Sequence, residues 1–131
     1  MLIAKVFLWF GAPLLTDEAY FIEWGQHFDL GYYDHTPMVG WVVSLMSIFG
    51  NHYLWYRFFP FAAHLIISYL VYDFLKEKSR SKAVVIAALF WASLGSLFHF
   101  PVLNDTALFF FASLSIYFFL RHKGRLNSPY V

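Results

Sequence analysis

Three long apolar segments, separated by short polar connections, dominate the pattern of the chain. They cover about 58–75, 83–100 and 102–120. A helix needs about 20 predominantly apolar residues to cross the hydrocarbon layer of a bilayer. A fourth apolar segment, 2–15, is shorter, contains Lys5, and is interpreted as a short first span or a signal anchor. The pattern therefore predicts an all-α, multi-pass transmembrane helix bundle with about four membrane spans.

The basic residues predict the direction of these spans. KEKSRSK at 76–82 lies between two apolar segments, and RHKGR at 121–125 follows the last one. The positive-inside bias places both runs on the cytoplasmic side, and Lys5 agrees with this orientation. The connections 16–57 and 101–105 are then extracytoplasmic. We expect a multi-pass protein of the plasma (inner) membrane whose active face is extracytoplasmic.

The extracytoplasmic loop 16–57 contains two shorter helical patterns, which we interpret as interfacial helices. The apolar run 38–49 would make a helix of about 18 Å, too short to cross a core of about 30 Å. Its small residues should allow close packing on a neighbouring helix; they are Gly40, Ser44 and Ser47. The second interfacial helix lies before this run, and we expect it to begin with Thr16 as its N-cap. Its aromatic stripe is predicted to face lipid and consists of Tyr20, Phe21, Trp24 and Phe28.

Composition supports a membrane setting and excludes several functional classes. Apolar types make up 60% of the 131 residues and charged types 13%, against about 25% charged residues in ordinary soluble domains. The surplus apolar surface must face lipid. The net charge of +1 gives no indication of a nucleic-acid partner, and the absence of Cys excludes disulfides and thiolate chemistry.

Acidic residues at the extracytoplasmic surface are the first candidates for chemistry. Asp17 and Glu18 directly follow the first apolar segment, and Asp105 lies beside Asn104 at the start of the last one. One interpretation is helix capping, which acids in a first turn perform well. The other is a general base or a metal ligand at the membrane edge. Asp105 favours the second interpretation, because an ionisable group at that depth is costly outside a wet cavity.

Two further features could bind an anion or a metal. The tight loop GYYDHTP at 31–37 contains Asp34 next to His35, a pair that could bind a metal or hold a phosphate. Arg57 lies at the extracytoplasmic mouth of a span, where it suits a lipid phosphate. Snorkelling toward the interface explains an arginine at this position equally well.

In combination, these motifs resemble a known family. T-D-E-A-Y at 16–20 is followed by G-Y-Y-D-H-x-P at 31–37, by F-G and R-F-x-P within 49–60, and by N-D at 104–105. This order resembles the dolichyl-phosphate-mannose protein mannosyltransferase-like family of membrane glycosyltransferases, which have the GT-C fold and are related to the lipid A aminoarabinose transferase. The resemblance extends from about residue 13 to residue 121.

The resemblance implies transfer of a sugar from a polyprenyl-phosphate donor to an extracytoplasmic acceptor, either a protein or a lipid or glycan. Asp17, with Glu18 as its partner, matches the acidic motif essential for transfer, and Asp105 matches a second acid on the same face. Asp34 corresponds to a metal-associated position, so a divalent metal is a possible cofactor. The residues implied for the donor phosphate are His35 and Arg57.

The chain departs from the family pattern in three ways. Asn104 stands where relatives commonly have Pro or Leu, and His35 makes phosphate binding dependent on pH. Family members also run to several hundred residues, so we expect the chain to be the N-terminal part of a longer enzyme. Two alternatives remain: a non-catalytic multi-pass membrane protein, and a component of a lipid-carrier flippase or polymerase.

Overall fold

The computed structural model describes residues 2–33, 35–93, 95–98 and 101–126, and every regular element in these ranges is a helix. The predicted all-α class is therefore confirmed for the described part of the chain. The helices are α1 (Leu2–Gly11), α2 (Thr16–Gln26), α3 (Met38–Ser47), α4 (Tyr53–Tyr56), α5 (Phe58–Leu75), α6 (Arg80–Ala92), α7 (Gly95–Phe98) and α8 (Asn104–Leu126).

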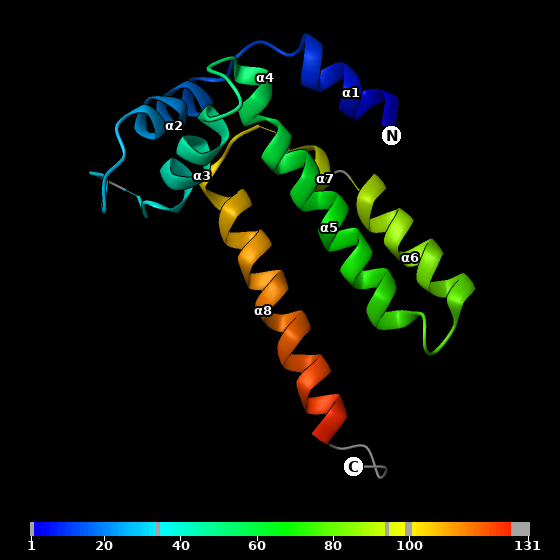
Figure 1. Cartoon of the computed structure of the whole chain (residues 1–131). Helices are drawn as coiled ribbons and strands as arrows, with labels where there is room; N and C mark the ends of the chain where they lie inside the picture. Colours follow the sequence, from blue (N-terminus) through cyan, green and yellow to red (C-terminus); the bar gives the residue numbers. More distant parts are fainter. Residues whose placement is uncertain (1, 34, 94, 99–100, 127–131) are drawn as a thin grey trace.

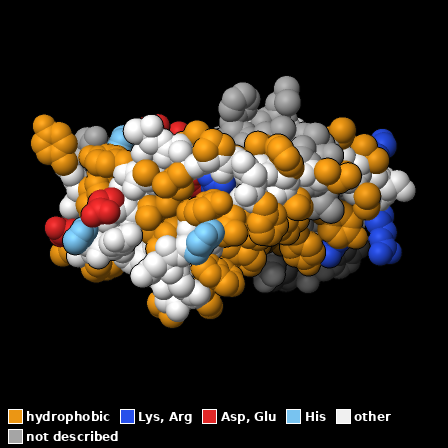
Figure 2. Space-filling view, turned by 90° about the horizontal axis from the view of Figure 1, so that it is seen from above, with side chains coloured by type: hydrophobic (Ala, Val, Ile, Leu, Met, Phe, Trp, Pro, Cys, Tyr) orange, Lys and Arg blue, Asp and Glu red, His pale blue; other side chains and the backbone are white. Residues whose placement is uncertain are grey.

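The helices form a short layer set on the end of a longer bundle. Helices α2 and α3 pack on each other at one end, and α5, α6 and α8 run away from them (Figure 1). Helix α5 contacts α6 on one side and α8 on another. Side chains of Asp, Glu and His gather on the side of α2 and α3, and Lys and Arg side chains lie at the opposite edge (Figure 2).

One helical stretch in the described residues, Tyr53–Leu75, is long and apolar enough to cross a membrane. Its 23 residues extend about 35 Å, which exceeds a hydrocarbon layer of about 30 Å. Helix α1 has 10 residues and α6 has 13, corresponding to about 15 and 20 Å. A bundle of about four spans therefore stays a prediction.

The span predicted at 83–100 is not a continuous helix. Helix α6 ends at Ala92, and Ser93 adopts an extended conformation with φ −65° and ψ 152°. Beyond the break, the Ser96 hydroxyl donates to the Trp91 carbonyl at 2.8 Å and to the Ser93 carbonyl at 2.7 Å. Side-chain donors of this kind satisfy carbonyls that a helix end leaves without partners. Apolar composition alone did not indicate this break.

Helices α2 and α3 approach closely, as the small residues of α3 predict. A Cβ added at Gly25 of α2 would lie 2.2 Å from Val43 Cγ1, and one at Gly40 of α3 would lie 2.5 Å from the Tyr32 hydroxyl. The Ser44 hydroxyl donates a short hydrogen bond to the Gly25 carbonyl. Helix α3 follows Pro37 as predicted, and the chain turns away after it at Gly50, whose φ is +138°.

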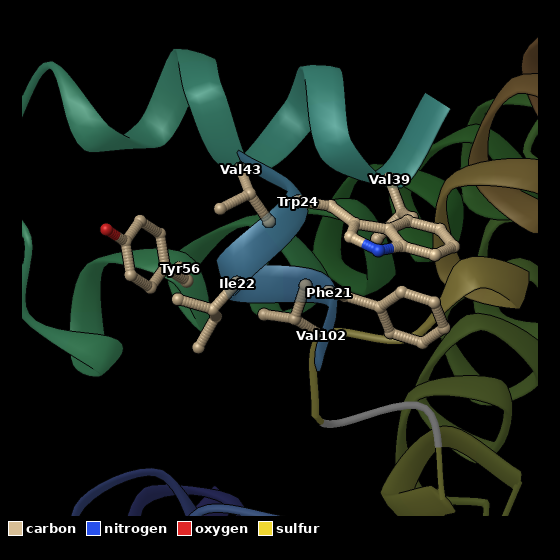
Figure 3. Packing of buried hydrophobic residues seen from close by; sticks show 7 residues of the cluster. All are labelled: Phe21, Ile22, Trp24, Val39, Val43, Tyr56 and Val102. Atoms are coloured by element: carbon tan, nitrogen blue, oxygen red, sulfur yellow. The ribbon is translucent and has the colours of Figure 1, made fainter. Parts of the chain in front are cut away.

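The packing of α2 corrects two expectations. Phe21 and Trp24, predicted to face lipid, are 5% and 8% exposed. They lie in a cluster of buried residues whose members, drawn in Figure 3, come from α2, α3, α4 and the segment before α8: Phe21, Ile22, Trp24, Val39, Val43, Tyr56 and Val102. Tyr20 and Phe28 are exposed. The N-cap of α2 is Leu15 rather than Thr16.

Candidate active site

A buried ion pair lies where the loop 16–57 meets the bundle. The carboxylate of Glu18, in the first turn of α2, is 0% exposed, and Arg57, between α4 and α5, is 1% exposed. Arg57 Nε donates to Glu18 Oε1 and Arg57 Nη2 donates to Glu18 Oε2, each at 2.7 Å. This two-pronged arrangement is the strongest geometry that an arginine and a carboxylate adopt. It fixes α2 against the start of α5.

Arg57 also binds the end of α1. Its terminal nitrogens donate hydrogen bonds of 2.9–3.3 Å to the carbonyls of Leu8, Trp9, Ala12 and Pro13. The last carbonyls of a helix lack partners inside the helix and carry partial negative charge. A guanidinium has five N–H donors, and Glu18 and these carbonyls occupy all of them. A phosphate on Arg57 would require at least one of these hydrogen bonds to break.

Glu18 in turn approaches the segment that leads into α8. Its Oε1 accepts a 3.4 Å hydrogen bond from the backbone N–H of Val102, and Val102 is 2% exposed. Asp17 is one residue before Glu18, and Asp105 is three residues after Val102. The contact therefore holds the chain segments that carry these two predicted catalytic acids at the same end of the bundle.

Asp17 and Asp105 are both exposed, each in the first turn of its helix. Within the part of the chain that the structure describes, neither carboxylate forms an ion pair with a basic side chain. The positive end of a helix dipole favours a carboxylate in that first turn. Both groups are therefore accessible to solvent and to ligands.

The loop 35–36 approaches the same end of the bundle. The Thr36 hydroxyl donates a 3.3 Å hydrogen bond to Oδ1 of Asn104, the residue directly before Asp105. The exposed His35 ring lies against two rings of α2, with centroids 5.7 Å from Phe21 and 5.9 Å from Trp24. Asp34, the predicted metal ligand, lies outside the described residues. In the ranges that are described, no group of three or more His, Asp or Glu side chains is arranged to hold a metal.

The ion pair is the feature that sequence analysis did not find. Arg57 was interpreted from its place at the mouth of an apolar segment, and Glu18 from its place beside Asp17, so the two were assigned separately. The acceptors and donors that complete the pair are backbone groups at the end of α1, in the two residues after it, and at Val102. Side-chain chemistry in a sequence gives no signal for such partners.

One comparison with known proteins finds a match. The family model for dolichyl-phosphate-mannose-protein mannosyltransferase matches residues 34–127, which is 94 of the 131 residues. His35, Arg57 and Asp105 lie inside the matched segment, whereas Asp17 and Glu18 precede it. No curated protein and no solved structure matches the chain.

Proposed function

The chain belongs to the dolichyl-phosphate-mannose-protein mannosyltransferase family of membrane glycosyltransferases, and from this premise we propose that it takes part in sugar transfer from a polyprenyl-phosphate donor to an acceptor outside the cytoplasm. The observation that carries the proposal is the convergence of three segments. The start of α2 contacts the segment before α8 through Glu18 and Val102, and the loop 35–36 contacts the start of α8 through Thr36 and Asn104.

Asp17 is the proposed general base. It accepts the proton of the acceptor hydroxyl while the acceptor oxygen forms a bond to the anomeric carbon of the sugar. The bond between that carbon and the phosphate oxygen breaks, and polyprenyl phosphate leaves with the electron pair. General base catalysis of this kind contributes about 10²- to 10⁴-fold to a rate. Exposure and the absence of a described ion-pair partner leave the Asp17 carboxylate accessible for this role.

Asp105 and His35 are proposed to act on the two substrates. Asp105, also exposed, would hold the acceptor hydroxyl in position beside the base. Protonated His35 would donate to the donor phosphate, and its exposed ring packs against the aromatic side of α2. Asp34 remains the candidate for a divalent metal, if the reaction uses one. The acceptor would be a protein or a lipid or glycan on the extracytoplasmic face of the plasma membrane.

We propose a positioning role for Glu18 and Arg57. Their ion pair is buried and joins α1, α2, α5 and the segment before α8. Loss of either group would displace Asp17 from the acceptor, because Asp17 is the neighbour of Glu18 in α2. Direct contact of Arg57 with the donor phosphate, which the family resemblance implies, stays a prediction.

Transfer of a labelled sugar from a polyprenyl-phosphate donor, measured in membranes containing the full-length protein, tests the proposal. Asp17→Asn should lower the transfer rate at least 100-fold, the smaller end of the effect expected for a general base. Asp29→Asn is the matched control, because Asp29 is exposed and its carboxylate bonds to the adjacent Leu30 N–H. Retained transfer in Asp17→Asn would remove Asp17 from the mechanism. Lipid movement without glycan transfer would favour a flippase.

A further inference from the structure

A hydrogen bond joins two segments that carry different parts of the candidate active site. The Thr36 hydroxyl and the Asn104 amide oxygen, 68 positions apart in the sequence, lie 3.3 Å from each other. Thr36 directly follows His35, the proposed contact of the donor phosphate. Asn104 directly precedes Asp105, the proposed contact of the acceptor. The bond therefore links the donor side of the site to the acceptor side, through two side chains that have no role in the proposed reaction.

The Asn104 end of this bond is firmly held. Asn104 is the first residue of α8, and the two residues before it are fixed from the buried side. The backbone N–H of Val102 donates to Glu18 Oε1, and its side chain is 2% exposed in the buried cluster. Leu103 packs against the same cluster. The amide of Asn104 is therefore a well-placed anchor for the segment that contacts it.

The Thr36 end is held less firmly. The last strong attachment before it is Tyr32, whose ring stacks on Trp24 with centroids 4.4 Å apart and whose hydroxyl donates to the Trp24 carbonyl. After Tyr32, the described side chains up to Thr36 are exposed, and Tyr33 is 99% exposed. A neutral hydrogen bond of this kind contributes modestly, because water competes for both groups. The Thr36–Asn104 bond therefore shifts the population of placements of this segment and does not lock one of them.

We propose that Thr36 and Asn104 are positioning residues, whose hydrogen bond holds His35 in the placement relative to Asp105 that the donor and acceptor require. The inference rests on the proposed function, which assigns His35 and Asp105 to the two substrates. A ligand binds more weakly in proportion as the competent state is less populated. One neutral hydrogen bond changes such a population by about 2- to 10-fold. Its loss should raise the KM for the donor by that factor, whereas saturating donor selects the competent placement and preserves kcat.

Transfer kinetics in membranes containing the full-length protein, with the polyprenyl-phosphate sugar varied, test this role. Thr36→Val and Asn104→Leu remove the hydroxyl and the amide and keep similar side-chain shapes. Each should raise the donor KM about 2- to 10-fold with little change in kcat, and the double variant should add little to the larger single effect. Thr36→Ser retains the hydroxyl and should retain the unsubstituted KM. Asn51→Leu, at an exposed position between α3 and α4, is the matched control.

A distance measurement tests the same bond without sugar transfer. The chain contains no Cys, so pairs of introduced cysteines can be spin-labelled in the full chain and measured by pulsed electron spin resonance. Labels at Tyr33→Cys and Leu108→Cys, both exposed positions, join the segment before Thr36 to α8. Thr36→Val should broaden their distance distribution. The reference pair, Leu45→Cys with Leu108→Cys, should be unchanged in Thr36→Val, because α3 contacts α8 directly.

Four results would overturn the inference. They are an unchanged donor KM in Thr36→Val and Asn104→Leu, a lower kcat at unchanged KM, additive effects on KM in the double variant, and an unchanged distribution between the labels at positions 33 and 108 in Thr36→Val. A lower kcat at unchanged KM would show loss of folded protein in place of lost positioning. Retained transfer in Asp17→Asn would contradict the proposed function alone, because it leaves the distance distributions untouched.

Discussion

Removal of Arg57 is the sharpest test of how the end of the bundle is held together. In Arg57→Met, the Glu18 carboxylate stays buried with backbone N–H groups as its remaining partners, the nearer being Val102 N–H at 3.4 Å. The carbonyls of Ala12 and Pro13, directly after α1, also lose the donors that Arg57 provides. Breaking a buried ion pair by removing one partner costs about 3–5 kcal/mol. Each buried acceptor left without a donor adds about 1–3 kcal/mol. We therefore expect Arg57→Met to lower the free energy of unfolding by an amount in the upper part of the range of about 3–5 kcal/mol.

The free energy of unfolding can be measured by titrating mixed micelles with a denaturing detergent and following tryptophan fluorescence. Arg57→Lys retains the charge but not the planar fork, and it should fall between Arg57→Met and the unsubstituted chain. Arg80→Met is the matched control, because Arg80 is exposed at the start of α6. It should change the free energy of unfolding by no more than about 0.5 kcal/mol.

A double-variant cycle separates the ion pair from the other hydrogen bonds of Arg57. Glu18→Gln with Arg57→Met should cost less than the sum of the single variants, by about 0.5–3 kcal/mol, because the groups interact directly. Additive costs would show that the two side chains do not stabilise each other. A cost below about 1 kcal/mol for Arg57→Met, the range of an exposed pair, would refute the reasoning.

Two further predictions concern the packing of α2 on α3 and use the same unfolding measurement. Gly25→Ala should destabilise the chain by about 1–3 kcal/mol, the usual cost of overpacking, because the new Cβ would overlap Val43. Its control is Gly31→Ala, where no atom lies within 4 Å of the added Cβ. That substitution should be neutral or slightly stabilising. Tyr32→Phe should lower the free energy of unfolding by about 1 kcal/mol, because the Tyr32 hydroxyl donates to the carbonyls of Trp24 and His27. Its control is Tyr33→Phe, at a 99% exposed position. That variant should have a free energy of unfolding within about 0.5 kcal/mol of the unsubstituted chain. Equal effects within either pair would contradict the packing described here.

Sequence patterns predicted helices well where one strong local signal dominates. The apolar run 58–75 has the same bounds as α5, and Pro37 and Gly50 bracket α3 correctly. The small residues of α3 predicted close contact with a neighbouring helix, because small side chains leave room for another backbone, and Ser44 does contact Gly25 of α2. The early end of α6 was not predicted, since Ser93 and Ser96 lie in a segment that is otherwise apolar.

The candidate site was predicted less completely than the helices. The order of the acidic motifs led to Asp17 and Asp105, and the structure shows both as exposed residues in first helical turns, while their catalytic roles stay predictions. The aromatic stripe of α2 was assigned to lipid because an amphipathic pattern does not identify its partner. Phe21 and Trp24 instead pack in the buried cluster with α3, so the pattern identified the apolar face but not what covers it.

The contact between Arg57 and α1 has a consequence for how the protein is made. The ribosome synthesises α1 well before it adds Arg57, so the carbonyls of Ala12 and Pro13 initially lack the donor that they have in the folded chain. A nascent chain stalled before Arg57 should therefore hold α1 loosely and expose it to proteolysis. Synthesis of one later arginine then completes the attachment of the first helix.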